Sequence, residues 1–179
     1  MRLAVIGTGL IGASLGLGAK RVGATVCGFD EDEATAEIAL ERGAVDEVKP
    51  TLGEALGGAE LAVVAVPVGH LAAQVRTVLE ASAGDCTVTD VGSTKSAVCE
   101  AAADSARFIG GHPVCGSEAR GPENARAELF DGATWFLTPV AQTDPERYRT
   151  LHAFVAAVGA VPVAVDPDAH DRLVALTSH

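Results

Sequence analysis

Short runs of apolar residues alternate along the chain with amphipathic, alanine-rich segments. Each run is continuously apolar, which is typical of a strand that a parallel sheet buries on both faces. The runs predict strands at Leu3–Ile6, Thr25–Phe29, Leu61–Val66 and Thr87–Thr89. The intervening segments have helical apolar spacing and propensity, and they predict helices at Ile11–Val22, Glu33–Arg42, Val68–Ala81 and Thr94–Ala103.

The alternation continues beyond Gly110. It predicts a strand at Thr134–Leu137, a helix at Pro145–Val158, a strand at Val161–Val165 and a helix from Pro167 onward. Strands that alternate with helices imply parallel pairing through right-handed crossovers. The expected fold is therefore α/β, a doubly wound Rossmann-type and mostly parallel sheet, with residues 1–165 as a dinucleotide-binding domain. The last helix ends without a capping glycine or polar tail, so we expect the natural protein to continue.

Composition narrows the function classes. The 179 residues carry a net charge of −11, which disfavours a nucleic acid or an anionic membrane surface as partner. No apolar run approaches the roughly 20 residues of a spanning helix, and the first run is too short for a signal peptide, so we expect a cytoplasmic protein. The dispersed cysteines are expected to be small buried hydrophobes, with no metal site: Cys27, Cys86, Cys99 and Cys115.

A G-x-G-x-x-G motif, Gly7-Thr8-Gly9-Leu10-Ile11-Gly12, follows the first strand and opens the first helix. Gly7 permits the tight turn, Gly9 lets the backbone approach a pyrophosphate, and Gly12 allows close packing of helix on strand. The helix start offers N–H groups and partial positive charge to phosphates. The motif predicts that these three glycines, with Leu10 and Ile11, bind a dinucleotide; a glycine-rich turn without a ligand is the alternative.

Asp30 ends the second strand, where a carboxylate accepts hydrogen bonds from the adenosine ribose. Its neighbours are acidic, and no Lys or Arg stands there for a 2′-phosphate, so we predict NAD over NADP. Asp30 can also cap the next helix. The loop with Val66 and Pro67 is expected to flank the cofactor, and His70 to be a solvated residue at a helix start.

Two polar, glycine-rich segments, Thr89–Lys95 and Gly110–Glu118, are expected at the same edge of the sheet, with Asp90 and Gly92 beside the cofactor. His112 is the candidate general acid–base group, because the pKa of imidazole lies near neutrality. A structural histidine is the alternative. Ser93 is either a helix cap or a site residue. Lys95 is either a surface lysine or a group that positions the loop or an anionic substrate.

Together these motifs resemble the prephenate/arogenate dehydrogenase family of tyrosine biosynthesis. The resemblance rests on the glycine motif with Ala13-Ser14, on Asp90–Lys95, on Gly110–Pro113 with Gly116-Ser117-Glu118, and on His170-Asp171 with Ser178-His179. It implies NAD-dependent oxidative decarboxylation of prephenate to 4-hydroxyphenylpyruvate, or of arogenate to tyrosine. It also implies that residues 166–179 begin a truncated helical dimerisation domain, and that the complete protein is a homodimer.

The resemblance implies residue roles as well. His112 takes the proton of the substrate hydroxyl as hydride leaves, and Ser93 orients His112 and the substrate or nicotinamide. Ser117, His170 and His179 become candidates for the substrate pocket. Two alternatives stay open: another NAD(P)-linked dehydrogenase or reductase of similar architecture, and a non-catalytic NAD-sensing domain. The family's arginine for a substrate carboxylate lies beyond His179, and Cys115 replaces a larger apolar residue.

Overall fold

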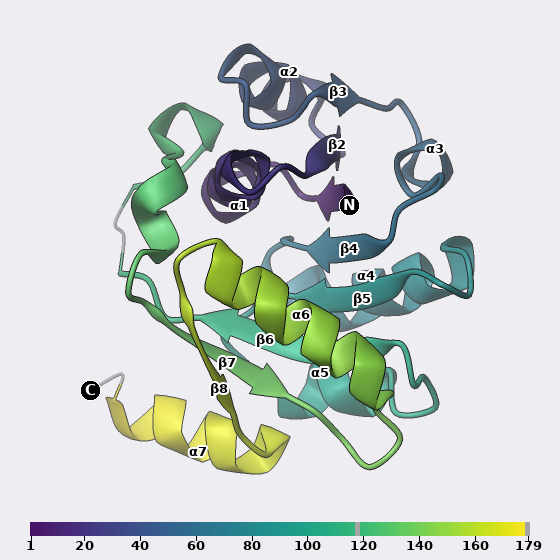
Figure 1. The fold of residues 1–179 in the computed structure, drawn as a ribbon, viewed down its shortest axis with the longest axis vertical. Coiled ribbons are helices and arrows are strands. Elements are labelled where there is room, and N and C mark those ends of the chain that lie inside the picture. The colour runs from purple at the N-terminus through teal and green to yellow at the C-terminus, as the bar shows by residue number, and fades with distance from the viewer. Residues whose placement is uncertain (117–118, 178–179) are drawn as a thin grey trace.

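The predicted strands assemble into one eight-stranded sheet in the computed structural model, which describes residues 1–116 and 119–177 (Figure 1). The strands lie in the order β3-β2-β1-β4-β5-β6-β7-β8. The doubly wound, mostly parallel α/β fold is therefore confirmed. The strand bounds are β1 (Arg2–Ile6), β2 (Thr25–Phe29), β3 (Glu47–Val48), β4 (Leu61–Val64), β5 (Thr87–Asp90), β6 (Phe108–Pro113), β7 (Thr134–Thr138) and β8 (Val161–Ala164).

Strand direction changes once across the sheet. The strands from β3 to β6 are parallel, β7 is antiparallel to β6, and β8 is parallel to β7. From β1 the chain winds outward first to β2 and β3 and later to β4 and β5, so the order reverses between β1 and β4. Ligands of open α/β sheets bind outside the carboxyl ends of the strands at such a reversal.

Helices cover both faces of the sheet. In Figure 1, α6 lies in front of the sheet, and α4 and α5 lie behind it. The helix bounds are α1 (Leu10–Arg21), α2 (Glu33–Glu41), α3 (Leu52–Ala55), α4 (Val68–Ala81), α5 (Ser96–Ala101), α6 (Pro145–Ala157) and α7 (Pro167–Thr177), with 3₁₀ turns η1 (Pro122–Asn124) and η2 (Ala127–Phe130). Among the described residues, no helix has both the length and the apolar character to cross a bilayer.

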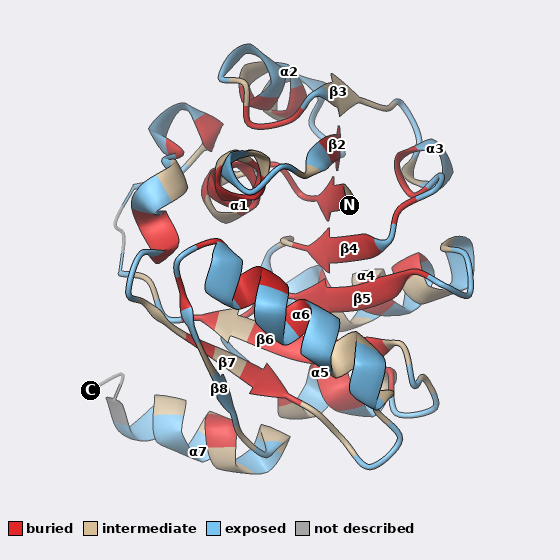
Figure 2. Ribbon diagram, viewed as in Figure 1, coloured by how far each residue is buried: buried red, intermediate tan, exposed pale blue. Residues whose placement is uncertain are grey.

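The core has two halves, one on each side of the sheet. Alternate residues of β1 divide between them: Leu3 and Val5 pack beneath α1 and α6, whereas Ala4 and Ile6 pack towards α3 and α4. This is the period-two alternation of a strand with both faces buried, and Figure 2 shows the central strands as buried throughout. The continuous apolar runs of the sequence follow from it. Gly43 after α2 adopts the left-handed conformation expected of a helix stop (φ +69°).

Some segments differ from their predictions. Gly110–Pro113 belongs to strand β6, whereas the glycine content of Gly110–Glu118 indicated a loop. The two glycines of β6 are required by packing: a Cβ on Gly110 would lie 2.3 Å from the hydroxyl oxygen of Thr138, and one on Gly111 would lie 2.5 Å from the carbonyl oxygen of Asp90. Helix α5 begins at Ser96 rather than Thr94.

Candidate active site

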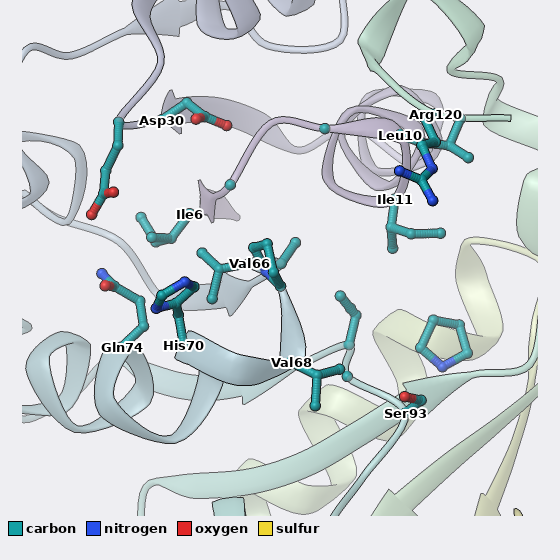
Figure 3. A pocket seen from close by; sticks show the side chains of 18 of the residues that line it. Ile6, Leu10, Ile11, Asp30, Val66, Val68, His70, Gln74, Ser93 and Arg120 are labelled. Atoms are coloured by element: carbon teal, nitrogen blue, oxygen red, sulfur yellow. The ribbon is translucent and has the colours of Figure 1, made fainter.

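A cavity of about 770 Å³ opens at the carboxyl ends of β1, β4 and β5 (Figure 3). It lies at the point where the strand order reverses, and its volume is typical of a site for a cofactor or small molecule. Most of the predicted site residues line it, although they come from separate parts of the chain: Gly7, Gly9, Leu10, Ile11, Asp30, Val66, Pro67, Gly92, Ser93 and His112.

The three motif glycines have three different surroundings. Gly7 has φ +95°, and a Cβ there would lie 2.5 Å from the carbonyl oxygen of Ala65. A Cβ on Gly12 would lie 1.9 Å from the carbonyl oxygen of Gly7, so Gly12 permits the packing of α1 on the loop rather than a ligand contact. A Cβ on Gly9 would meet no atom within 4 Å. Gly9 therefore leaves its backbone open to a ligand in the cavity.

The start of α1 is suited to an anion. Gly9 is its N-cap residue, and no side chain of a described residue caps the first turn. The free N–H groups of that turn carry partial positive charge. Figure 3 shows Arg120 beside Leu10 and Ile11, at this end of the cavity. Backbone donors and a guanidinium thus converge where the motif places a pyrophosphate.

Asp30 lies at the other side of the cavity, at the end of β2 (Figure 3). Its Oδ2 accepts hydrogen bonds from the backbone N–H of Thr8 at 2.7 Å and from the Thr8 hydroxyl at 3.1 Å. Its Oδ1 accepts from the backbone N–H of Asp32 at 3.1 Å. Asp32, not Asp30, caps α2. Asp30 is thus held by the glycine loop, and Glu31 beside it adds a second carboxylate to the lining.

A buried ion pair lies beneath the cavity. Asp90 and Lys95 have fully buried side chains, and the Lys95 ammonium donates to Asp90 Oδ2. Asp90 also accepts from the backbone N–H of Gly92 at 2.9 Å and of Gly111 at 3.0 Å. The Asp90 carboxylate thus joins the loop after β5 to β6 and does not line the cavity, where the cofactor contact was predicted. Lys95 is correspondingly not a surface lysine.

His112 belongs to a chain of hydrogen bonds that runs away from the cavity. Its Nδ1 lies 2.9 Å from Nε2 of His170, and Nδ1 of His170 lies 2.8 Å from Oδ1 of Asp171. His112 lines the cavity, whereas His170 is fully buried. His170 does not line the cavity, where the substrate contact was predicted: among the described residues its ring is covered, and both of its nitrogens are engaged within the protein.

Two groups in this series of hydrogen bonds, His112 and Asp171, have shifted pKa values. Burial, then the neighbouring His170 and Lys95, lower the pKa of His112 from 6.5 to about 4, against the opposite effect of Asp171. Burial alone would raise the pKa of Asp171. Hydrogen bonds from Ser96, His170 and Lys95 outweigh it and lower that pKa from 3.8 to about 2. At neutral pH the imidazole of His112 is thus neutral and the Asp171 carboxyl is ionised.

Ser93 is exposed on the loop that borders the cavity and is not a helix cap. The start of α5 is capped instead from α7, where Asp171 accepts from the backbone N–H of Lys95 at 2.7 Å and of Ser96 at 2.9 Å. Among the described residues Ser93 makes no hydrogen bond to His112, although both line the same cavity. The predicted substrate residues Ser117 and His179 lie outside the described residues.

Sequence reasoning did not single out Gln74 or Arg120, which line the cavity, and judged His70 only as a solvated residue. His70 is indeed exposed near the start of α4, but it faces the cavity (Figure 3). Arg120 carried a usable signal, because it is a rare cation within the polar segment that follows β6. Gln74 carried none, because a glutamine on a predicted helix is typical of any solvated surface.

The cysteines are free, and burial raises the pKa of each thiol. Cys27, Cys86 and Cys99 are buried as expected, whereas Cys115 is partly buried and borders the cavity. A raised pKa favours the thiol over the nucleophilic thiolate. In the part of the chain that the structure describes, no group of three or more His, Cys, Asp and Glu side chains is arranged to hold a metal ion.

Known proteins match almost the entire chain. Residues 15–164 match the family model described as prephenate dehydrogenase, nucleotide-binding domain. A relative from Streptomyces niveus, described as a probable prephenate dehydrogenase, is 38% identical over 98% of this chain. Synechocystis arogenate dehydrogenase superposes on the whole chain with a TM-score of 0.94 and 35% identity. Prephenate dehydrogenase from Aquifex aeolicus, in complex with hydroxyphenyl propionate and NAD+, superposes on it with a TM-score of 0.93 and 27% identity.

These proteins are longer than the chain. The chain spans 48% of the length of the Streptomyces relative, and 64% of each of the two superposed chains. The family match, by contrast, takes in most of the chain. It begins within α1, after the glycine motif, and includes Asp90, Ser93 and His112. The chain belongs to the prephenate dehydrogenase nucleotide-binding domain family.

Proposed function

We propose that this chain is the nucleotide-binding and proton-accepting part of an NAD-dependent dehydrogenase that oxidatively decarboxylates prephenate or arogenate. The observation that carries the proposal is the position of His112, whose neutral imidazole lines the same cavity as the open backbone of Gly9. A base and a dinucleotide loop that share one cavity are what this reaction requires.

The residues present fit NAD. The N–H groups at the start of α1, with Arg120, would hold the pyrophosphate, and Gly9 would let it approach the backbone. Asp30 would accept hydrogen bonds from the adenosine ribose hydroxyls, and Glu31 beside it would repel a 2′-phosphate. Val66, Pro67 and Gly92 would border the nicotinamide end. Bound NAD would supply the acceptor for a hydride from the substrate.

His112 accounts for the proton. Its neutral ring can accept the proton of the substrate's ring hydroxyl while hydride leaves the carbon that bears it. The bond to the ring carboxylate then breaks, carbon dioxide leaves, its bonding electrons complete the aromatic ring, and His112 returns the proton to the phenolic oxygen. Ser93, exposed at the same cavity, would orient the hydroxyl or the nicotinamide.

The test is NADH formation by the complete protein at saturating NAD, with prephenate and arogenate in parallel. Turnover of either supports the proposal, and the ratio of the two rates identifies the substrate. We expect His112→Asn to reduce turnover by roughly 10²–10⁴-fold, the range that a general base contributes, with nearly unchanged affinity for NAD.

Two results would contradict the proposal. Binding of NAD without turnover of either substrate favours another NAD(P)-linked dehydrogenase or a sensing domain. Undiminished turnover in His112→Asn would remove His112 from the catalytic role. The sensing domain also predicts tight binding of NAD and no loss of function in His112→Asn.

Three further expectations rest on the family resemblance. The first is that residues 166–179 begin a helical domain after a dinucleotide-binding domain of residues 1–165. The second is that the complete protein is a homodimer, which light scattering on that protein would test. Leu176, 78% exposed on α7, is consistent with a further covering surface. The third is that Ser117 and His179 contact the substrate.

A further inference from the structure

The pair formed by His170 and Asp171 is not used by the reaction proposed above. His170 is fully buried, and its ring lies edge-on to Phe136 with centroids 5.4 Å apart. Its two ring nitrogens have partners on opposite sides, His112 at 2.9 Å and Asp171 at 2.8 Å. A buried imidazole that connects a cavity-lining histidine to a carboxylate has a consequence for the proton of that histidine.

The donor and acceptor at each contact follow from the charge of Asp171, the last group in this series of hydrogen bonds. The ionised carboxylate of Asp171 can only accept, so Nδ1 of His170 carries the proton at that contact. When His170 carries this single proton, its other ring nitrogen, Nε2, accepts a hydrogen bond. Its partner, Nδ1 of His112, must therefore donate. The lone pair of His112 is left on Nε2, the nitrogen not engaged by His170.

We propose that His170 and Asp171 are positioning residues that hold His112 in its Nδ1–H tautomer, with the Nε2 lone pair directed to the substrate. The inference deepens the proposed function and rests on it. It assigns His170 a role without substrate contact, which fits the complete burial of its ring.

The charges around His112 favour this arrangement. The groups that face it are Lys95, before α5, with its partner Asp90 on β5, and His170 with Asp171 on α7. Lys95 and a protonated His170 would each oppose a positive charge on His112, whereas the Asp171 carboxylate supports one. When His112 gains the substrate proton, the hydrogen bonds through His170 connect the new charge to that carboxylate.

Asp171 also attaches the two histidines to the backbone before α5. Its two oxygens accept from the backbone N–H groups of Lys95 and Ser96 in addition to His170. The carboxylate that orients the histidines is therefore attached to the loop that carries Ser93. This places the two predicted catalytic residues, His112 and Ser93, under the control of one group on α7.

The direct test is the tautomer of His112 in the complete protein labelled with ¹⁵N-histidine. Long-range ¹H–¹⁵N spectra distinguish protonated from unprotonated ring nitrogens, and the His112→Asn variant identifies the signals. The proposal predicts a protonated Nδ1 and an unprotonated Nε2 at neutral pH. A protonated Nε2 would overturn it. This measurement needs no turnover, so an inactive protein would refute the proposed function without deciding the tautomer.

Two substitutions give a second, independent readout. In His170→Gln the side-chain carbonyl can still accept from His112, whereas in His170→Phe a ring remains against Phe136 but no acceptor does. We expect His170→Phe to lower kcat by on the order of tenfold to a hundredfold, part of what a general base contributes, with little change in the KM for NAD. His170→Gln should retain more activity. His152→Gln, on the exposed side of α6, is the matched control and should behave as the unaltered protein.

A role in packing alone predicts the reverse order. Phe fills the space of the histidine ring better than Gln does, so kcat in His170→Phe at or above that in His170→Gln would overturn the proposal. If either variant fails to fold, the tautomer of the unaltered protein still decides the question.

Discussion

At the β1–β2 end of the cavity the binding surface is made of backbone, whereas at the β5–β6 end it rests on buried charged side chains. Gly9 and the first turn of α1 offer open peptide groups to a ligand. Beneath the other end, Asp90 and Lys95 form an ion pair with no exposed surface. The first end thus offers shape and peptide dipoles to a ligand, and the second holds His112 and the loop with Ser93 through a network of side chains.

The two constructions have different costs. An open loop needs only room, so its glycines can be altered one at a time with separate effects on folding and binding. A buried pair of charges is costly unless both partners remain. We therefore expect substitutions at the β1–β2 end (the nucleotide end) to cost less stability than substitutions at the β5–β6 end (the chemical end). The following experiments test that difference.

The largest expected effect is the loss of stability caused by Lys95→Met. It leaves the Asp90 carboxylate buried without its cation, and breaking a buried pair costs about 3–5 kcal/mol in the free energy of unfolding. Chemical denaturation would measure it. The control is Lys49→Met, which removes a partly exposed ion pair with Glu47 and should leave the free energy of unfolding almost unchanged. Equal losses in the two variants would contradict the comparison.

The glycine loop should separate folding from binding. In Gly12→Ala the methyl group meets the carbonyl of Gly7, and we expect a loss of about 1–3 kcal/mol in stability by thermal denaturation. In Gly9→Ala the methyl group projects into open space at φ −65°, so stability should stay within about 0.5 kcal/mol. Calorimetry should instead show at least a tenfold weaker Kd for NAD, about 1.4 kcal/mol. A destabilised Gly9→Ala protein would show that the two roles are not separate.

A smaller effect is expected on cofactor choice. The unaltered protein should bind NADP at least tenfold more weakly than NAD, and Asp30→Asn should narrow that ratio by about tenfold, or 1.4 kcal/mol. The control is Asp32→Ala, which removes the cap of α2 and should cost about 1 kcal/mol of stability without changing the ratio. Equal affinities for the two cofactors in the unaltered protein would contradict the assignment of Asp30.

The smallest effect per step is the pH dependence of stability, because one proton limits the change for each pH unit. His112 has a pKa of about 4 when folded and 6.5 as the ordinary value, so the unfolded chain binds the proton first as the pH falls. Its contribution to stability is complete above pH 6.5 and decreases towards pH 4, by less than about 1.4 kcal/mol per pH unit, the limit for one proton. Asp171 adds a second loss between pH 3.8 and about 2. Urea denaturation from pH 7 to 5 should give a shallower slope in His112→Asn, and equal slopes would refute this account.

The residues at the nucleotide end could be predicted because each lies next to a predicted strand in the sequence. The glycine motif, Asp30 and Val66 follow directly from strands that the apolar pattern predicts, and they line the cavity as expected. The chemical end joins residues far apart in the sequence: Lys95 lies close to Asp90 in the chain, but His170 meets His112 only after β7, α6 and β8 have formed. The spacing of residues in the sequence does not predict that contact, and the expectation that His170 lies in the substrate pocket came from the family resemblance.

The prediction for the residues of strand β6 was wrong for a related reason. Gly110 and Gly111 have the composition of a loop, yet they are glycines because Thr138 and Asp90 lie too close for any Cβ. That closeness depends on neighbouring strands that the local sequence does not describe. Tertiary packing therefore overrides the local preference of the segment.

The caps that Asp171 provides for α5 mean that the sheet and the side-chain network behind His112 end at different residues. An ancestral or engineered recombination that joined a new partner after Val165 would keep every strand of the sheet. It would nevertheless leave the backbone N–H groups of Lys95 and Ser96 without their acceptor and His112 without its partner. The segment from Pro167 to Asp171 must therefore travel with the sheet for the site to stay complete, however the rest of the protein is exchanged.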